Sequence, residues 1–143
     1  MADHHVRRSI GEHILRCFVL IVALFIMSLG IALSAKANLG VSPISCTPYV
    51  LSLALPLTMG TVTILMHLSF VAVQAALLKR QFRPAHLLQI PVVFIFGALT
   101  DFSMWLMAPL EPSGYLWSVI LCLFSCAVIG FGVFLQVLSL IHI

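Results

Sequence analysis

Four long apolar stretches, separated by short polar segments, dominate the chain. They cover residues 14–35, 59–78, 87–108 and 115–137. Each is about 20 residues long, the length that an α-helix needs to cross a bilayer core of ~30 Å. The pattern therefore predicts an all-α, polytopic membrane protein with four spanning helices in a single membrane domain, 1–143.

The segment 36–58, between the first two stretches, is also apolar but is interrupted by Gly40, Pro43, Pro48 and Pro56. Its longest proline-free piece, Tyr49–Leu55, is too short to span a bilayer. Two interpretations remain open. The segment either lies on the membrane surface or forms a re-entrant half-helix that begins near Ser42–Pro43, where proline suits a first helical turn. A re-entrant segment would have to be packed in protein or line a cavity.

Composition agrees with a membrane protein. Hydrophobic residues make up 62% of the chain and charged residues 8%, whereas soluble domains have about 45–50% and ~25%. The first apolar stretch is also longer than the core of a secretory signal peptide, so we do not expect it to be cleaved.

The basic residues predict the orientation of the chain. Lys36 is set apart from the other lysines and arginines, which fall within residues 7–16 and 79–83. The loop 109–114 contains Glu111 and no basic residue. The positive-inside rule therefore places the tail 1–13 and the loop 79–86 in the cytoplasm. The predicted partner is the lipid bilayer, and nothing in the sequence indicates a nucleic acid.

Asp101 is a lone carboxylate inside the third apolar stretch. A charge at this depth costs roughly 2.5–3.5 kcal/mol on insertion scales, so we expect Asp101 to face protein or a water-filled cavity. Thr100 is adjacent, and Gln89 lies near the start of the same stretch.

A polar stripe is predicted along the second stretch. Gly60, His67 and Gln74 are spaced by two helical turns, so they share one face that must be turned toward protein. The polar groups either connect helices by hydrogen bonds, each worth about 0.6 kcal/mol, or form a proton-linked or cation-linked site that uses His67 and Asp101. The candidate pathway residues are Asp101, His67, Gln74, Gln89, Thr100 and Ser42.

Enzymatic chemistry has little support in the sequence. The stretches lack the second carboxylate that an intramembrane aspartyl protease needs, and the chain has no H-E-x-x-H motif. Its four cysteines include no C-x-x-C pair and are interpreted as packing residues. We therefore predict a protein that is not an enzyme and has no metal or cofactor.

Three segments carry a resemblance to a known family: GIALSAKANLGVSPIS (30–45), LLKRQFRPAHLLQI (77–90) and GALTDFSM (97–104). They resemble the YczE/YitT-type family of bacterial integral membrane proteins. The A-x-L-G-x-x-P element of that family corresponds to Ala37–Pro43, and its glutamine and aspartate correspond to Gln89 and Asp101. The resemblance implies a fold and a place in the bacterial inner membrane, with the N-terminus in the cytoplasm, but no substrate.

The resemblance also implies a longer protein, because family members have about six spans arranged as in an inverted repeat. Gly30 aligned with Gly132 places Leu33 opposite Leu135 in helices of opposite direction. The end of the chain, 138–143, matches what a transposon-end sequencing adapter would encode, so we expect it to be non-native and the native sequence to be truncated near Val137.

These patterns predict a small-solute or ion transporter of unknown substrate, because interrupted segments and inverted repeats are typical of secondary transporters. The alternative is a non-transporting membrane protein that binds a partner or supports an envelope process. If the chain ends as printed, a four-span protein would have to form a pathway by dimerising, so a homodimer is also left open.

Overall fold

The structure is a computed structural model that describes the backbone of residues 10–78 and 89–141 and the side chains of 14–78 and 89–139. Within these residues it contains five α-helices and no strand: α1 (Ile10–Ala37), α2 (Pro43–Ala54), α3 (Met59–Leu78), α4 (Gln89–Leu106) and α5 (Tyr115–Ile141). Four of them, all but α2, are long and apolar enough to cross a membrane. The prediction of an all-helical, multi-pass membrane protein is confirmed at this level.

The helices agree with the predicted spans to within one turn at most ends. Helix α3 has the predicted bounds, and α4 ends at Leu106, before the end of its apolar stretch at residue 108. Helix α1 begins earlier, at Ile10, so the predicted tail 1–13 includes its first turn. Helix α5 continues to Ile141, through most of the segment 138–143. The predicted cytoplasmic loop 79–86 lies outside the described residues.

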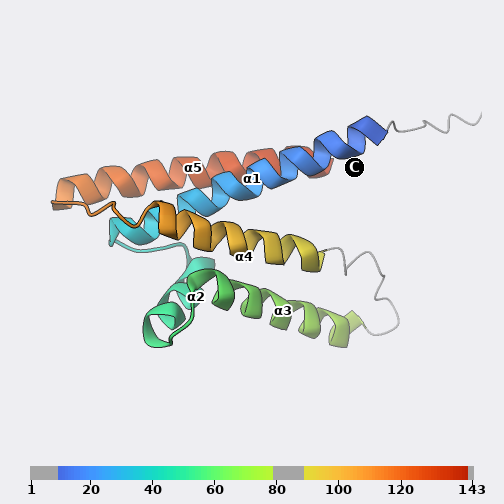
Figure 1. Cartoon of the computed structure of the whole chain (residues 1–143), viewed down its shortest axis with the longest axis horizontal. Coiled ribbons are helices and arrows are strands. Elements are labelled where there is room, and N and C mark those ends of the chain that lie inside the picture. Colours follow the sequence, from blue (N-terminus) through green and yellow to red (C-terminus); the bar gives the residue numbers. More distant parts are fainter. Residues whose placement is uncertain (1–9, 79–88, 142–143) are drawn as a thin grey trace, which may run out of the picture.

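The long helices are arranged as two antiparallel pairs (Figure 1). Helix α1 packs along α5, and α3 packs along α4. Contacts between α1 and α4 join the pairs, and α2 packs against the first turns of α3. We call the end of the molecule where α1 ends and α3 begins the α2 end. The loops that connect α1 to α3 and α4 to α5 both lie there.

The contact between α1 and α5 is reciprocal. Gly30 of α1 faces Ile129 and Ser125, which lie about one and two turns before Gly132 in α5. Gly132 in turn faces Met27 and Ala23, which lie about one and two turns before Gly30 in α1. A Cβ on Gly30 would lie 3.0 Å from the Ile129 nitrogen, and one on Gly132 would lie 3.0 Å from the Met27 nitrogen. Small residues let the two backbones approach this closely. The two helices therefore meet about a local two-fold axis at these glycines.

The turn after α1 has two residues with positive φ. Asn38, directly after the helix, has φ 56°, a left-handed conformation that asparagine tolerates at a helix C-terminus. Gly40 has φ 141°, and its carbonyl oxygen accepts a hydrogen bond of 2.9 Å from the Ser34 hydroxyl. Helix α2 then begins at Pro43, with Ser42 as its N-cap. A helix is therefore present where the re-entrant interpretation places one.

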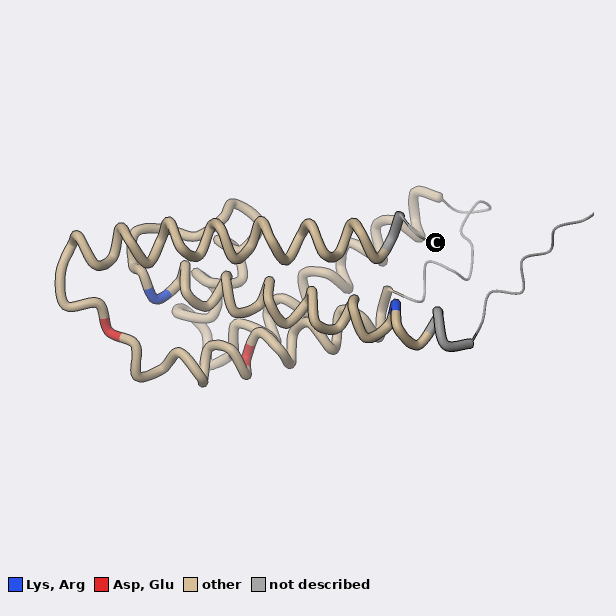
Figure 2. Tube along the Cα trace, turned by 90° about the horizontal axis from the view of Figure 1, so that it is seen from above, with Lys and Arg blue, Asp and Glu red and all other residues tan. Residues whose placement is uncertain are grey.

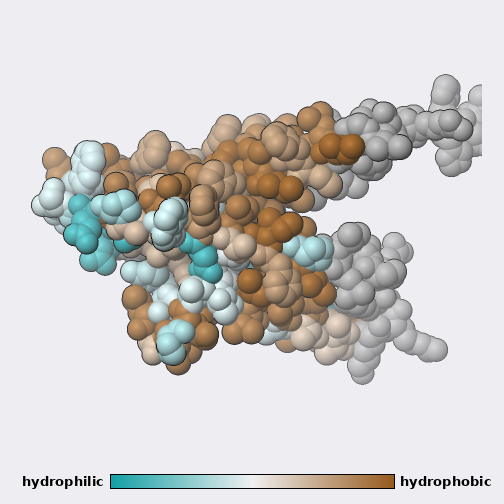
Figure 3. Space-filling view, viewed as in Figure 1, coloured by the Kyte–Doolittle hydropathy of each residue, from teal (hydrophilic) through white to brown (hydrophobic). Residues whose placement is uncertain are grey.

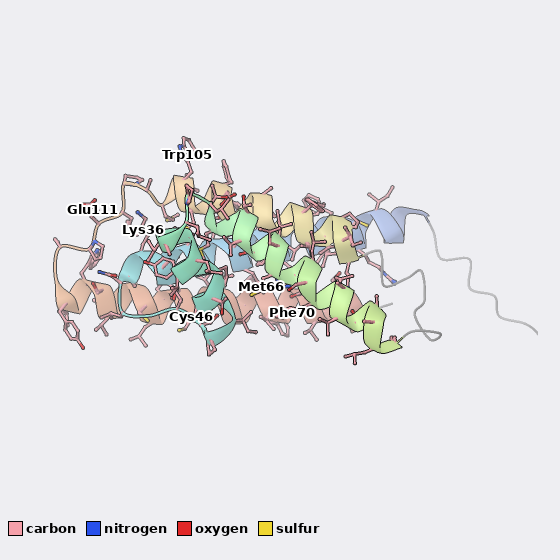
Figure 4. All side chains as sticks on the ribbon, turned by 90° about the horizontal axis from the view of Figure 1, so that it is seen from below. Lys36, Cys46, Met66, Phe70, Trp105 and Glu111 are labelled. Atoms are coloured by element: carbon pink, nitrogen blue, oxygen red, sulfur yellow. The ribbon has the colours of Figure 1, made fainter. Side chains whose placement is uncertain are left out.

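Apolar side chains cover much of the surface, as the view in Figure 3 shows, which fits a lipid bilayer. Four charged side chains fall within the described part of the chain (Figure 2): Arg16, Lys36, Asp101 and Glu111. Lys36 and Glu111 lie at the α2 end, where Trp105 points away from the helices (Figure 4). Trp105, Tyr115 and Trp117 are exposed there, as expected of rings at a membrane boundary.

Candidate functional site

The Asp101 carboxylate caps the first turn of α3. Its Oδ1 accepts a hydrogen bond of 2.7 Å from the backbone N–H of Gly60, and its Oδ2 accepts one of 2.7 Å from the Thr58 hydroxyl. The Thr58 hydroxyl oxygen also accepts a hydrogen bond from the backbone N–H of Thr61. The N–H groups of a first helical turn have no partner within the helix, and the helix dipole favours negative charge beside them. Asp101 therefore connects α4 to the beginning of α3.

Two glycines make this contact geometrically feasible. A Cβ on Gly60 would overlap the Gly97 carbonyl oxygen and lie 2.6 Å from the Asp101 carboxyl carbon. A Cβ on Gly97 would overlap Ile64 and lie 3.0 Å from the Gly60 carbonyl oxygen. Helices α3 and α4 are thus in backbone contact one turn away from Asp101, which brings its short side chain within reach of α3.

The polar stripe of α3 is turned toward α4. Gly60 contacts Asp101, and the rings of His67 and Phe96 pack edge to face with their centroids 6.4 Å apart. Near the far end of α3, the Gln89 side-chain amide donates a hydrogen bond of 3.1 Å to the Gln74 side-chain oxygen. The stripe faces protein, as its polarity requires. Gln74 and Gln89 are engaged with each other.

A cavity of about 490 Å³ lies between the two helix pairs. Its wall includes residues from all five helices and the Ser42 cap: Leu24, Met27, Ile31, Ser42, Ile44, Ser45, Pro48, Met59, Thr63, Met66, His67, Val92, Val93, Phe96, Thr100, Ile129, Val133 and Gln136. In Figure 3 the surface is hollowed between the pairs on the side away from the α2 end. Of the predicted pathway residues, Ser42, His67 and Thr100 line the cavity. The residues that do not are Asp101, Gln74 and Gln89.

The hydroxyl groups of the wall are engaged in hydrogen bonds. Thr63 donates to the Met59 carbonyl at 2.7 Å, and Thr100 donates to the Phe96 carbonyl at 2.8 Å. The Ser42 hydroxyl donates to the Ser45 hydroxyl at 3.1 Å.

Two side chains of the wall remain free to bind. His67 of α3 and Gln136 of α5 make no side-chain hydrogen bond to any described residue, and they stand on opposite helix pairs. Gln136 was not among the predicted residues. Its sequence signal is its helical spacing from Val133 and Ile129, which also line the cavity.

Two polar contacts between described residues join the pairs, and both lie toward the α2 end. The Ser28 and Ser103 hydroxyls, both buried, are 2.8 Å apart and connect α1 to α4. The Lys36 ammonium group donates to the Ala108 carbonyl at 3.3 Å. At the opposite end, the Ser139 hydroxyl donates to the Arg16 carbonyl at 3.4 Å, and this hydrogen bond lies within the α1–α5 pair. The hydrogen bond between Gln89 and Gln74 likewise lies within the α3–α4 pair.

No three His, Cys, Asp or Glu side chains in the described part of the chain are placed to hold a metal ion together. The four cysteines, Cys17, Cys46, Cys122 and Cys126, are free thiols. The predictions about enzyme activity, cofactors and metals stay predictions.

The sequence of residues 14–142 matches a protein family of unknown function, DUF6198. The chain belongs to this family. Comparison with curated proteins gives no match, and neither does comparison with solved structures. Membership in DUF6198 covers nearly all of the chain, from the first turns of α1 to the end of α5. The resemblance to the YczE/YitT-type family and the truncation stay predictions.

Proposed function

We propose that this DUF6198 protein carries a small solute across the bacterial inner membrane by way of the cavity between its two helix pairs. The cavity is the observation that carries the proposal. At about 490 Å³ it has the size of a small-molecule site, and four helices suited to a bilayer surround it. Sites between the helices of a bundle are a common place for ligands.

Helix α2 supports the same proposal. Its first turns contribute Ser45 and Pro48 to the cavity wall, and both are buried although much of α2 is exposed. We interpret α2 as a re-entrant segment, since irregular backbone at membrane depth is tolerated where it lines a cavity. Interrupted helices at the substrate site are a recurring feature of secondary transporters.

The proposed movement is a rocking of one helix pair against the other. The polar links between the pairs cluster toward the α2 end, so this end would act as the closed side and the opposite end as the open side. The distribution of basic residues assigns the α2 end to the outside of the cell. The state described here would then face the cytoplasm. Rigid-body rocking about a fixed site is the usual means of alternating access.

The second candidate is a membrane protein that does not transport, whose polar residues only connect helices. Asp101 favours it, because both carboxylate oxygens are engaged in capping α3. Every buried side-chain nitrogen or oxygen of the described residues also has a hydrogen-bond partner. A partner-binding role, including a homodimer, would belong to this candidate.

Cysteine labelling distinguishes the two candidates. In a protein without its native cysteines, Met66→Cys places a thiol on the cavity wall, and Leu65→Cys places one on the exposed side of the same turn. We expect a charged, membrane-impermeant thiol reagent to modify Met66→Cys and to leave the lipid-facing Leu65→Cys unmodified. The labelling should occur from both membrane faces in vesicles of opposite orientation if access alternates.

Failure of the impermeant reagent to modify Met66→Cys from either face would contradict transport through this cavity. A small membrane-permeant maleimide, applied to the unfolded protein, checks that the thiol is present in both variants.

A further inference from the structure

The part of the cavity wall that the structure describes carries no Lys, Arg, Asp or Glu side chain. The Asp101 carboxylate, although next to Thr100 in sequence, is held by Thr58 and Gly60 at the start of α3 and is not part of the wall. A charged ligand in this cavity would lose its water without gaining a countercharge, which is strongly unfavourable.

The wall is mostly apolar, and part of it can adapt its shape. Met27, Met59 and Met66 contribute flexible thioether side chains, which fill irregular spaces around ligands of different outline. Phe96 adds an aromatic surface next to them. A ligand that is itself largely apolar, and preferably planar, would match this surface.

Two polar side chains of the wall have unused hydrogen-bonding capacity. The His67 ring is held between Phe70 and Phe96, at centroid distances of 6.2 and 6.4 Å, and bonds to no described residue. Gln136 faces the same cavity from α5 and is likewise uncommitted. A neutral imidazole and an amide each offer both a donor and an acceptor, so each can bind a polar group of a ligand from its own side of the cavity.

We infer that the cavity binds an uncharged, mainly apolar small molecule that carries one hydrogen-bonding group, and that His67 and Gln136 recognise this group. The inference rests on the proposed function for the role of the cavity and adds the class of solute. It excludes inorganic ions and charged metabolites as ligands of this cavity.

Three probes with one ring system and different charge test the inference. Indole is neutral and has a single N–H donor, indole-3-acetate is an anion, and tryptamine is a cation at pH 7. Binding to the full chain in lipid nanodiscs is measured by equilibrium dialysis, with protein-free nanodiscs subtracted. We expect saturable binding of indole and at least tenfold weaker binding of both charged probes.

Variants of the two polar residues complete the test. The single N–H of indole can donate to His67 or to Gln136, so at least one of the variants His67→Leu and Gln136→Leu should weaken indole binding by roughly three- to tenfold, the range for a lost hydrogen bond. Ser69→Ala, on the exposed side of α3, is the matched control and should bind indole as the unchanged protein does. If a leucine variant does not fold, His67→Phe or Gln136→Met, which keep more of the side-chain volume, takes its place.

The inference is overturned if either charged probe binds as well as indole or if both leucine variants retain full affinity. Absence of saturable indole binding also overturns the inference. A cavity that is filled by lipid chains would give this result. None of these outcomes changes the expected labelling of Met66→Cys. If Met66→Cys is labelled and indole does not bind, the proposed transport stands and the solute belongs to another class. Indole binding without labelling of Met66→Cys would instead reject transport and keep the binding site.

Discussion

At the residue scale, Asp101 belongs to the structure of two helices at once. It lies on α4, and its hydrogen bonds go to the first turn of α3. Two N-terminal donors and the positive end of the helix dipole stabilise the carboxylate where a lipid chain could not. The sequence predicted that this carboxylate faces protein or water, but it could not predict which residues the carboxylate contacts. Its partners are Thr58, which directly precedes α3, and Gly60 in the first turn of α3, and their distance from Asp101 depends on how α3 and α4 cross.

Replacement of Asp101 by residues with fewer acceptors tests this capping role. Asp101→Leu removes both acceptors and should lower the free energy of unfolding by about 2 kcal/mol, and Asp101→Asn, which keeps one acceptor, by about 1 kcal/mol. Unfolding in mixed micelles followed by circular dichroism measures both values. If Asp101→Asn is fully stable but uptake of a solute in vesicles is abolished, Asp101 takes part in transport and the capping role is secondary.

At the scale of elements, the crossing of α3 and α4 depends on Gly60 and Gly97. We expect Gly60→Ala to destabilise the protein by roughly 2 kcal/mol or more, because its methyl group overlaps the Gly97 carbonyl and the Asp101 carboxylate. Gly130→Ala is the matched control. Gly130 lies in α5 with no atom within 4 Å of an added Cβ, so alanine should be neutral there or stabilise the helix by up to about 1 kcal/mol. Thermal unfolding of the two variants in the same detergent compares them, and equal stability would contradict the close crossing.

The sequence predicted the elements better than their contacts. Apolar length alone located the four long helices, and one of the two interpretations left open for 36–58 had a helix begin near Ser42–Pro43, where α2 begins. The spacing of His67 and Gln74 identified the face of α3 that meets α4. The cavity could not be predicted, since its wall combines side chains from all five helices whose relative positions no local pattern determines. For the same reason the sequence did not single out Gln136, nor did it predict the hydrogen bond between Gln74 and Gln89.

At the scale of the whole molecule, the contact between α1 and α4 joins the two helix pairs. The buried hydroxyls of Ser28 and Ser103 are 2.8 Å apart in this contact. In a protein without native cysteines, Ser28→Cys and Ser103→Cys together should form a disulfide on mild oxidation, since side-chain atoms this close fit disulfide geometry. Mass spectrometry of the joined peptides detects the bond.

A matched pair of cysteines controls for random collisions. Ser28→Cys combined with Ser69→Cys, which lies exposed on α3, should form no disulfide under the same conditions. If both pairs cross-link equally, the contact between α1 and α4 is not the fixed link between the helix pairs. If only Ser28 and Ser103 cross-link, the bond also provides a means to lock the pairs together and to ask whether solute movement stops.

The pairing of α1 with α5 has a consequence for how the protein is made. Helix α1 leaves the ribosome first and α5 last among the described helices, yet each is the other's most extensive neighbour. Until α5 is inserted, the surface of α1 around Gly30 and Ala23 contacts lipid or the translocon, because the α5 residues that pack against it are not yet in the membrane. Contacts between such distant parts of a chain form late. Membrane quality-control proteases would therefore meet an incompletely folded intermediate for nearly the whole of translation, and any substitution that slows the insertion of α5 should shorten the lifetime of every helix made before it.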